Sequence, residues 1–304
     1  GEKVVMRLLP ENAKGFSLEI LGFHGSGLEL LHENVNRSVG MILATGPTGS
    51  GKTTTLYTLL DLINTPGLNI STVEDPIEYR MPRINQTQVR PDIGFTFANG
   101  LRSLLRQDPD VLMVGEIRDS ETASLAINAA LTGHLVVSTL HTNSASGALP
   151  RLLDLGVEPF LISSTVNIII AQRLVRTLYK TKKETKLTPD QIARLQKYVD
   201  IERMLKFLRD ERIISPTAKI EEVTFYSPVP APPESDDGYQ GRIGIHEVLL
   251  VTPAIRELIM KNANADTIDK EARSNGMMSM LEDGIFKAAQ GITTIEEVLR
   301  ATQE

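Results

Sequence analysis

Eight consecutive residues, Gly46 to Thr53, fit the phosphate-binding pattern G-x-x-x-x-G-K-[ST]. They follow the apolar run Val39–Ala44 and lead into the helical pattern Thr53–Ile63, so they would join a buried strand to a helix. Glycines let such a loop turn its backbone N–H groups toward a polyphosphate, and the start of the helix adds partial positive charge. Lys52 would neutralise the β- and γ-phosphates, and the Thr53 hydroxyl would bind Mg²⁺ beside them. The residues expected to contact the nucleotide are Gly46, Pro47, Thr48, Gly49, Ser50, Gly51, Lys52, Thr53 and Thr54.

Carboxylates follow two other apolar runs. The run Val111–Val114 leads through a glycine to Glu116, the pattern of a Walker B strand, which delivers an acid to the magnesium ion and its water. Glu116 could hold Mg²⁺ through water or orient the attacking water. After the second run, Glu74, Asp75 and Glu78 lie within five positions, and such mutually repelling acids persist best where they share a cation. The plainer alternatives are an exposed acid at the end of a buried strand and an ordinary acidic turn.

One histidine and several arginines are further candidates. His141 follows the apolar run Leu135–Thr139, where it could sense the charge lost from a γ-phosphate, although a lone histidine is usually structural. An arginine is by default a solvated surface residue, but one inserted by a neighbouring subunit speeds phosphoryl transfer by about 10³–10⁵. Arg102 and Arg106 are spaced to share one face of a helix expected at Asn99–Arg106. The arginines considered are Arg7, Arg90, Arg102, Arg106, Arg118 and Arg151.

Strand-like and helical patterns alternate through the first half of the chain. Strands are expected at Val39–Ala44, Asn69–Val73, Val111–Val114 and Leu135–Thr139, and helices at Thr53–Ile63, Asn99–Arg106, Ser120–Leu131 and Ala145–Leu155. This alternation predicts an α/β fold, a mostly parallel sheet covered by helices, with nucleotide at the carboxyl ends of the strands.

The second half of the chain has a different character. A charged connector, Lys180–Lys186, precedes an amphipathic helix near Asp190, and a Pro-rich acidic loop spans Ser227–Gly238. The last segment, Thr252–Gln303, has the pattern of three or four short helices. The apolar positions of the helix near Asp190 are Ile192, Leu195, Val199 and Leu205, and the methionines expected in the core of the last segment are Met277, Met278 and Met280.

Composition narrows the function classes. With 304 residues, of which 41% are hydrophobic, the chain can bury a sizeable core. It contains no cysteine, which excludes disulfides and thiolate metal sites and suits a reducing cytoplasm. A net charge of -6, 5% aromatic residues and no tryptophan argue against nucleic acid as the main partner. No apolar run reaches the ~20 residues that span a bilayer, and the first residues do not resemble a signal peptide.

Four motifs in order resemble the Walker A, Asp box, Walker B and His box of bacterial secretion ATPases. They are Gly46–Tyr57, Val73–Tyr79, Leu104–Asp119 and Thr132–Asn143. Two later stretches, Gly238–Glu247 and Glu282–Val298, are similar to the C-terminal motifs of the type II secretion and type IV pilus assembly motors, and Ala171–Arg176 also looks like a family motif.

The resemblance implies a hexameric RecA-like ATPase that uses ATP and Mg²⁺ in the cytoplasm and works on an inner-membrane platform protein. It implies that Glu78 activates water, that Glu116 is the Walker B acid and that His141 senses phosphate. Arg7 matches an arginine that family members direct at the nucleotide, and the start within an apparent strand suggests a piece of a longer chain. The expected segments are the end of an N-terminal domain (1–9), an interdomain linker and entry (10–37), a RecA-like core (38–178), an insert (179–240) and a C-terminal helical subdomain (241–304).

The insert departs from the family pattern. Members often carry two Cys-x-x-Cys pairs that bind zinc, and the corresponding places here are Tyr179 with Lys182 and Ala231 with Glu234. None of these four side chains can form a thiolate site, so no zinc is expected and packing alone must hold the insert together. Three other functions stay open: a pilus-retraction motor, which the insert and the region after it disfavour, a DNA-translocating ATPase, and a nucleotide-binding scaffold without turnover.

Overall fold

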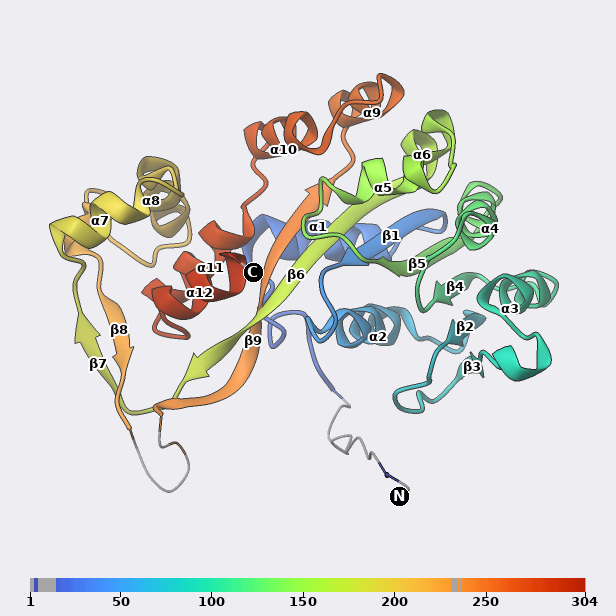
Figure 1. Cartoon of the computed structure of the whole chain (residues 1–304), viewed down its shortest axis with the longest axis horizontal. Helices are drawn as coiled ribbons and strands as arrows, with labels where there is room; N and C mark the ends of the chain where they lie inside the picture. Colours follow the sequence, from blue (N-terminus) through green and yellow to red (C-terminus); the bar gives the residue numbers. More distant parts are fainter. Residues whose placement is uncertain (1–2, 5–14, 231–234, 236, 304) are drawn as a thin grey trace.

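The computed structural model describes residues 3–4, 15–230, 235 and 237–303. Within them, seven strands form one sheet in the order β3-β2-β4-β5-β1-β6-β9, in which every pair is parallel except β6 with β9 (Figure 1). The predicted α/β fold with a mostly parallel sheet is therefore confirmed. The strands are β1 (Gly40–Thr45), β2 (Ile70–Glu74), β3 (Ile84–Gln88), β4 (Val111–Val114), β5 (Leu135–Leu140), β6 (Val166–Leu178) and β9 (Tyr239–Leu250).

Helices cover both faces of the sheet. Alternate residues of β1 enter different hydrophobic clusters: Met41 and Leu43 face one side, whereas Ile42 and Ala44 face the other. A central parallel strand buried on both faces gives the continuous apolar run that made it recognisable. The elements are α1 (Gly25–Val35), α2 (Lys52–Ile63), α3 (Phe97–Leu104), α4 (Ser120–Leu131), α5 (Ala148–Asp154), α6 (Pro159–Thr165) and a 3₁₀ turn, η1 (Pro91–Ile93).

Several boundaries differ from those expected. Strand β4 and helix α4 have the predicted bounds, but α3 begins at Phe97, where the Thr96 hydroxyl accepts a hydrogen bond from the Asn99 N–H, and it ends at Leu104. Arg106 therefore lies beyond the helix, and the shared helical face predicted for it and Arg102 is wrong. Helix α5 is also shorter than the expected Ala145–Leu155, and β3 was missed because four of its five residues are polar.

The insert is a two-stranded ribbon with two helices rather than the single helix expected near Asp190. It consists of β7 (Lys182–Thr185), α7 (Pro189–Leu195), α8 (Ile201–Asp210), a 3₁₀ turn, η2 (Ile220–Glu222), and β8 (Phe225–Pro228). Thr188 and Asp200 cap α7 and α8, which divides the apolar pattern into two helices.

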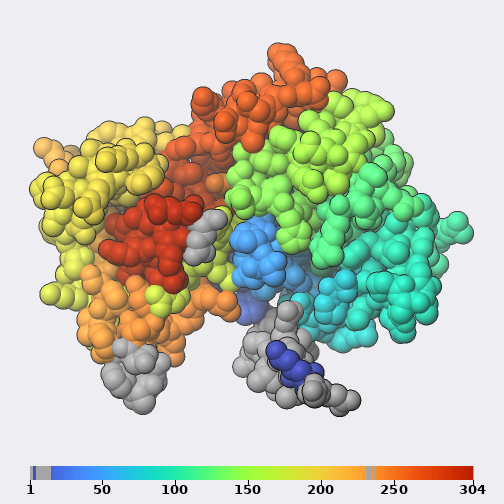
Figure 2. All heavy atoms as spheres, in the orientation of Figure 1, coloured from blue at the N-terminus to red at the C-terminus, as the bar shows by residue number. Residues whose placement is uncertain are grey.

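Apolar side chains of the insert, including Leu205 and Phe225, form one cluster with Ile285 and Phe286 of the C-terminal helices. Figure 2 shows the yellow insert against the red C-terminal segment. Lys182, where the resemblance places a cysteine, donates a 2.6 Å hydrogen bond to the Gly291 carbonyl. The described part of the insert is thus held by packing and hydrogen bonds; residues 231–234 lie outside the described residues.

Four helices follow the sheet, in agreement with the three or four expected. They are α9 (Pro253–Met260), α10 (Ala265–Ser274), α11 (Met280–Ala289) and α12 (Ile295–Gln303). Residues 241–250, assigned to the helical subdomain in the expected segmentation, belong to the edge strand β9. Met277 and Met280 are buried in the main core, as expected, and Met278 is partly buried.

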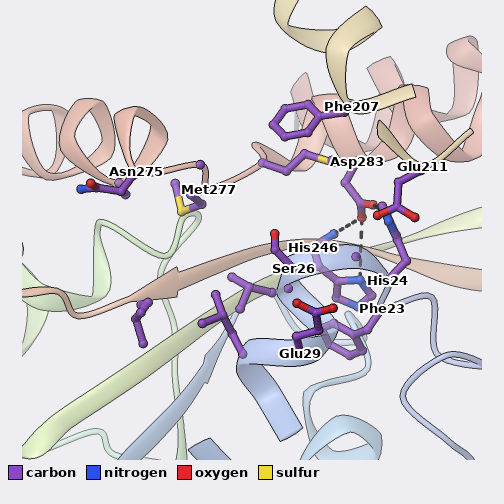
Figure 3. A pocket seen from close by; sticks show the side chains of 18 of the residues that line it. Phe23, His24, Ser26, Glu29, Phe207, Glu211, His246, Asn275, Met277 and Asp283 are labelled. Carbon is purple, nitrogen blue, oxygen red and sulfur yellow. Dashed lines mark hydrogen bonds and ion pairs between the residues drawn. The ribbon is translucent and has the colours of Figure 1, made fainter. Parts of the chain in front are cut away.

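A buried ionic cluster ties α11 to the sheet and to α1. The Asp283 carboxylate lies 2.6 Å from His24 Nε2 and accepts hydrogen bonds from the His246 backbone N–H at 2.7 Å and the Lys287 ammonium at 2.5 Å. Although burial alone would raise the pKa of Asp283, Lys287 and His24 hold it well below its usual range. Figure 3 shows Asp283 at one side of a cavity of about 540 Å³ that α1, β9 and the C-terminal segment line.

Candidate nucleotide-binding site

The loop between β1 and α2 has the backbone that the glycine pattern predicts. Gly46, Gly49 and Gly51 have φ angles of 141°, 80° and 91°, which L side chains rarely adopt. A side chain on Gly46 would also meet the Gln172 carbonyl oxygen at 2.4 Å. The loop then enters α2, whose first residue is Lys52, so its N–H groups lie at a helix N-terminus, as phosphate binding requires.

Lys52 folds back over its own loop. Its ammonium group donates hydrogen bonds to the carbonyl oxygens of Gly46 at 2.8 Å and Pro47 at 3.0 Å. Burial lowers the pKa of Lys52, and the negative charge of Glu116 opposes this shift. Phosphate oxygens carry full charge and would compete with the two neutral carbonyls for this ammonium.

Glu116, His141 and Arg118 meet at the ends of β4 and β5. Glu116 Oε2 lies 3.2 Å from His141 Nε2 and 2.5 Å from Arg118 Nε. The structure thus brings His141 against the carboxylate of Glu116. Arg118 was one of the arginines considered in the sequence, but its pairing with Glu116 was not predicted. The available signal was its position only two residues after Glu116.

Hydrogen bonds hold the strand ends in register. At the end of β1, the Thr45 hydroxyl accepts a hydrogen bond from the Thr142 backbone N–H at 2.8 Å. The same hydroxyl donates to the Thr142 carbonyl at 2.9 Å. The Thr139 hydroxyl donates to the Gly115 carbonyl at 2.8 Å. The phosphate loop, Glu116 and His141 are therefore fixed to one another through the sheet.

The three acids at the end of β2 do not form a group that could hold a metal ion, as is true of every set of three or more such residues in the described part of the chain. Glu74 is 2% exposed, and its oxygens accept hydrogen bonds from Tyr57, from Thr72 at 2.5 Å and from Gln86 at 3.2 Å. Burial, followed by the hydrogen bond with Glu74, raises the pKa of Tyr57. Glu74 therefore belongs to an internal network, which corrects the expected three-acid cluster.

The other two acids of this motif are more accessible. Asp75 is exposed, and Glu78, the expected water-activating residue, is partly buried in the loop that follows. The Asp75–Pro76 peptide bond between these strand-end residues is cis. The expected role of Glu78 in activating water therefore stays a prediction.

The candidate arginines differ in their surroundings. Arg102 forms an ion pair with Glu121 of α4 and donates to the Asn99 side chain at 3.2 Å. Arg106 is exposed beyond the end of α3, and Arg7 lies outside the described residues. Arg102 therefore has a structural partner within its own chain.

The donor set suits a metal that a phosphate helps to bind. Among the described residues, no group of three or more histidines, aspartates or glutamates is placed to hold a metal ion alone. Mg²⁺ prefers octahedral oxygen coordination and in phosphate sites takes one or two protein ligands, the phosphates and water. Thr53 in the first turn of α2 and Glu116, through water, would supply the protein part of that shell.

Comparison with known proteins identifies the family. The family model described as "Type II/IV secretion system protein" matches residues 1–300. The chain belongs to this family. The resemblance expected from the four motifs is confirmed, and curated relatives are named as a type II secretion ATPase and a type IV pilus assembly ATPase.

Curated members of the family match the chain along its whole length. The type II secretion system ATPase E of Vibrio cholerae is 47% identical over 304 residues, covering 100% of this chain and 56% of the relative. The type IV pilus assembly ATPase PilB of Pseudomonas aeruginosa is 45% identical over 304 residues, covering 100% of this chain and 50% of PilB. The chain thus spans about half the length of these relatives.

Solved structures agree with the fold. The pilus retraction motor PilT with bound ADP is similar with a TM-score of 0.67 and 30% identity, covering 98% of this chain and 69% of PilT. The Legionella pneumophila ATPase DotB has a TM-score of 0.62 at 22% identity, covering 93% of this chain and 64% of DotB, and supports the fold alone. In the part of the chain described here, no helix combines the length and apolarity that a membrane span needs.

Proposed function

We propose that this chain is the ATP-hydrolysing part of a motor that assembles a pilus-like fibre, either a type II secretion pseudopilus or a type IV pilus. The observation that carries the proposal is the arrangement of Lys52, Glu116 and His141 at the ends of neighbouring strands in a secretion-family chain. The relatives at 45–47% identity are named as type II secretion ATPases and pilus assembly ATPases.

Each residue of the site has a separate proposed role in phosphoryl transfer. Lys52 and the N–H groups around it would bind the phosphates, and Thr53 would hold Mg²⁺, which when bound neutralises charge on the phosphate oxygens. Glu78 would accept a proton from the attacking water. Glu116, oriented by Arg118, would hold the water shell of Mg²⁺, and His141 on the same carboxylate would respond when the terminal phosphate leaves.

The proposal extends to assembly and location. A homo-hexamer would let Arg7, Arg102 or Arg106 of one subunit reach the nucleotide of the next, as arginines supplied in trans do in phosphoryl-transfer sites. For Arg102, this requires exchange of its Glu121 partner for phosphate. The motor would work in the cytoplasm, bound to the inner membrane only through a platform protein.

Assembly is favoured over retraction. The assembly and secretion relatives are 45–47% identical to this chain, whereas the retraction motor PilT is 30% identical. DNA translocation has less support, because the chain carries a net charge of -6 and few aromatic residues for stacking on single strands. The presence of Lys52 and Glu116 at the Walker A and Walker B positions disfavours a nucleotide-binding scaffold that does not hydrolyse ATP.

Two substitutions in the full-length protein test the assignment. Lys52→Ala should abolish nucleotide binding or turnover, and Glu78→Gln should keep Mg·ATP binding while phosphate release falls by at least 10². Arg256→Ala is the control, since Arg256 is an exposed residue of α9 that was not among the candidate arginines. Turnover like that of the wild type in either Lys52→Ala or Glu78→Gln would contradict the proposed site.

A further inference from the structure

Gln172 is a buried polar residue that the proposed chemistry leaves unused. It lies in β6, 2% exposed, within the family-like stretch Ala171–Arg176. Its neighbour Ala171 pairs with Thr45 at the end of β1, directly before the phosphate loop. This position places the Gln172 carboxamide against the phosphate loop and the start of α2.

Both polar atoms of the Gln172 side chain are hydrogen-bonded to the phosphate-loop region. Nε2 donates to the Ser50 carbonyl at 2.7 Å, and Oε1 accepts from the Thr55 hydroxyl at 2.8 Å. The orientation of the amide follows from chemistry, because a carbonyl oxygen can only accept and the group facing it must be the NH₂. Buried bonds of this kind are costly to break, since each lost partner leaves a polar group unsatisfied.

The bond to Ser50 controls the direction of an N–H group. The Ser50 carbonyl and the Gly51 N–H belong to one planar trans peptide, so they point in opposite directions. When Gln172 holds the carbonyl beneath the loop, the Gly51 N–H is turned to the opposite side. The bond to Thr55 fixes the first turn of α2, which carries Lys52 and Thr53.

The backbone and the side chain of Gln172 both lie close to the glycines of this loop. Its carbonyl oxygen would lie 2.4 Å from a side chain on Gly46, and its Nε2 would lie 3.1 Å from one on Gly51. The residue therefore contacts the region beneath both the first and last glycines of the motif. A side chain on Gly46 would therefore require β6 to move, whereas one on Gly51 would displace the end of the Gln172 side chain.

We propose that Gln172 is a positioning residue for nucleotide binding: it holds the Ser50–Gly51 peptide and the start of α2 in the phosphate-binding conformation. It acts through the loop and touches no reacting atom. The inference rests on the proposed binding of nucleotide at this loop, and binding of Mg·ADP to the wild-type protein tests that assumption separately.

A general contribution to the core is the competing explanation, and Asn167 provides a matched control. Asn167 is a buried carboxamide of the same strand, 6% exposed, which donates to the Val39 carbonyl at 3.1 Å, beside the other end of β1. Asn167→Ala should lower stability as a buried polar deletion does, without acting on the phosphate loop.

The experiment measures Kd for Mg·ADP, together with KM and kcat for ATP, in the full-length protein and its variants. Gln172→Glu keeps the shape and the acceptor for Thr55 but places a carboxylate oxygen against the Ser50 carbonyl. It should raise the Kd and the KM at least tenfold while kcat at saturation stays within about threefold. Asn167→Ala should leave the Kd within twofold of the wild-type value.

Thr55→Val, which replaces the hydroxyl that donates to Gln172 with a methyl group, covers the case in which Gln172→Glu does not fold. It should also weaken Mg·ADP binding, by about three- to tenfold. An unchanged Kd in the variant that folds, or equal weakening by Asn167→Ala, would overturn the proposal. Wild-type protein that binds no Mg·ADP would instead refute nucleotide binding at the loop.

Discussion

Asp283→Asn should release α11 from the rest of the molecule. The substitution keeps the size of the side chain but removes the negative charge that lies 2.5 Å from the Lys287 ammonium. The Lys287 side chain is only 2% exposed, so water cannot replace that charge. Removing one member of a buried ion pair costs about 3–5 kcal/mol, because the remaining charge stays buried without compensation. His24 would lose the same partner from the side of α1.

Hydrogen exchange of the α11 amides measures this loss locally. A cost of about 3–5 kcal/mol corresponds to a fall in protection of roughly 10²–10³-fold or somewhat more. The matched control is Asp92→Asn, which breaks an exposed pair with Arg90 whose side chains are both 60% exposed and should change protection little. Asp283→Asn combined with Lys287→Met should recover much of the loss. Protection of α11 in Asp283→Asn within about threefold of wild type would refute this reasoning.

Two further predictions concern Glu247 and Arg118. Burial raises the pKa of Glu247, although the N–H groups of Ala145 and Met280 stabilise its charge, so its folded form binds a proton more readily than its unfolded form. The stability that protonated Glu247 contributes is therefore fully present below the ordinary pKa of 4.5 and is lost as pH rises through the folded pKa. The Tm of the wild type minus that of Glu247→Gln should fall over this pH interval. A Tm difference that stays constant with pH would contradict this prediction. Arg118→Ala should lower kcat about tenfold or more with a smaller change in KM, because Glu116 loses the guanidinium 2.5 Å away. The control Arg256→Ala on α9 should leave kcat unchanged, and an unchanged kcat in Arg118→Ala would show that Arg118 does not orient Glu116.

Local patterns in the sequence predicted the central part of the fold. Strands β1, β4 and β5 are buried on both faces and give continuous apolar runs, and the glycines of the phosphate loop have the positive φ angles that their spacing requires. Strand β3 has no such signal, because it is a mostly polar strand at the edge of the sheet. Its place could be known only once its partner β2 was in position.

Contacts between distant residues account for the remaining differences. Glu74 is internal because Tyr57 on α2 and Gln86 on β3 converge on it, which the acidic motif around Asp75 does not reveal. Asp283 meets His24 across 259 positions of sequence. Such pairings depend on packing between elements that are distant in the sequence. The pairing of Arg118 with Glu116 could have been considered from the sequence, because the two residues are only two positions apart.

Release of phosphate from saturating Mg·ATP, compared between the full-length wild-type protein and Lys52→Ala, measures the central claim most directly. Steady turnover by the wild type and its loss in Lys52→Ala are expected, because the ammonium that contacts the phosphate loop would be gone. Equal phosphate release from both proteins would contradict hydrolysis at this site.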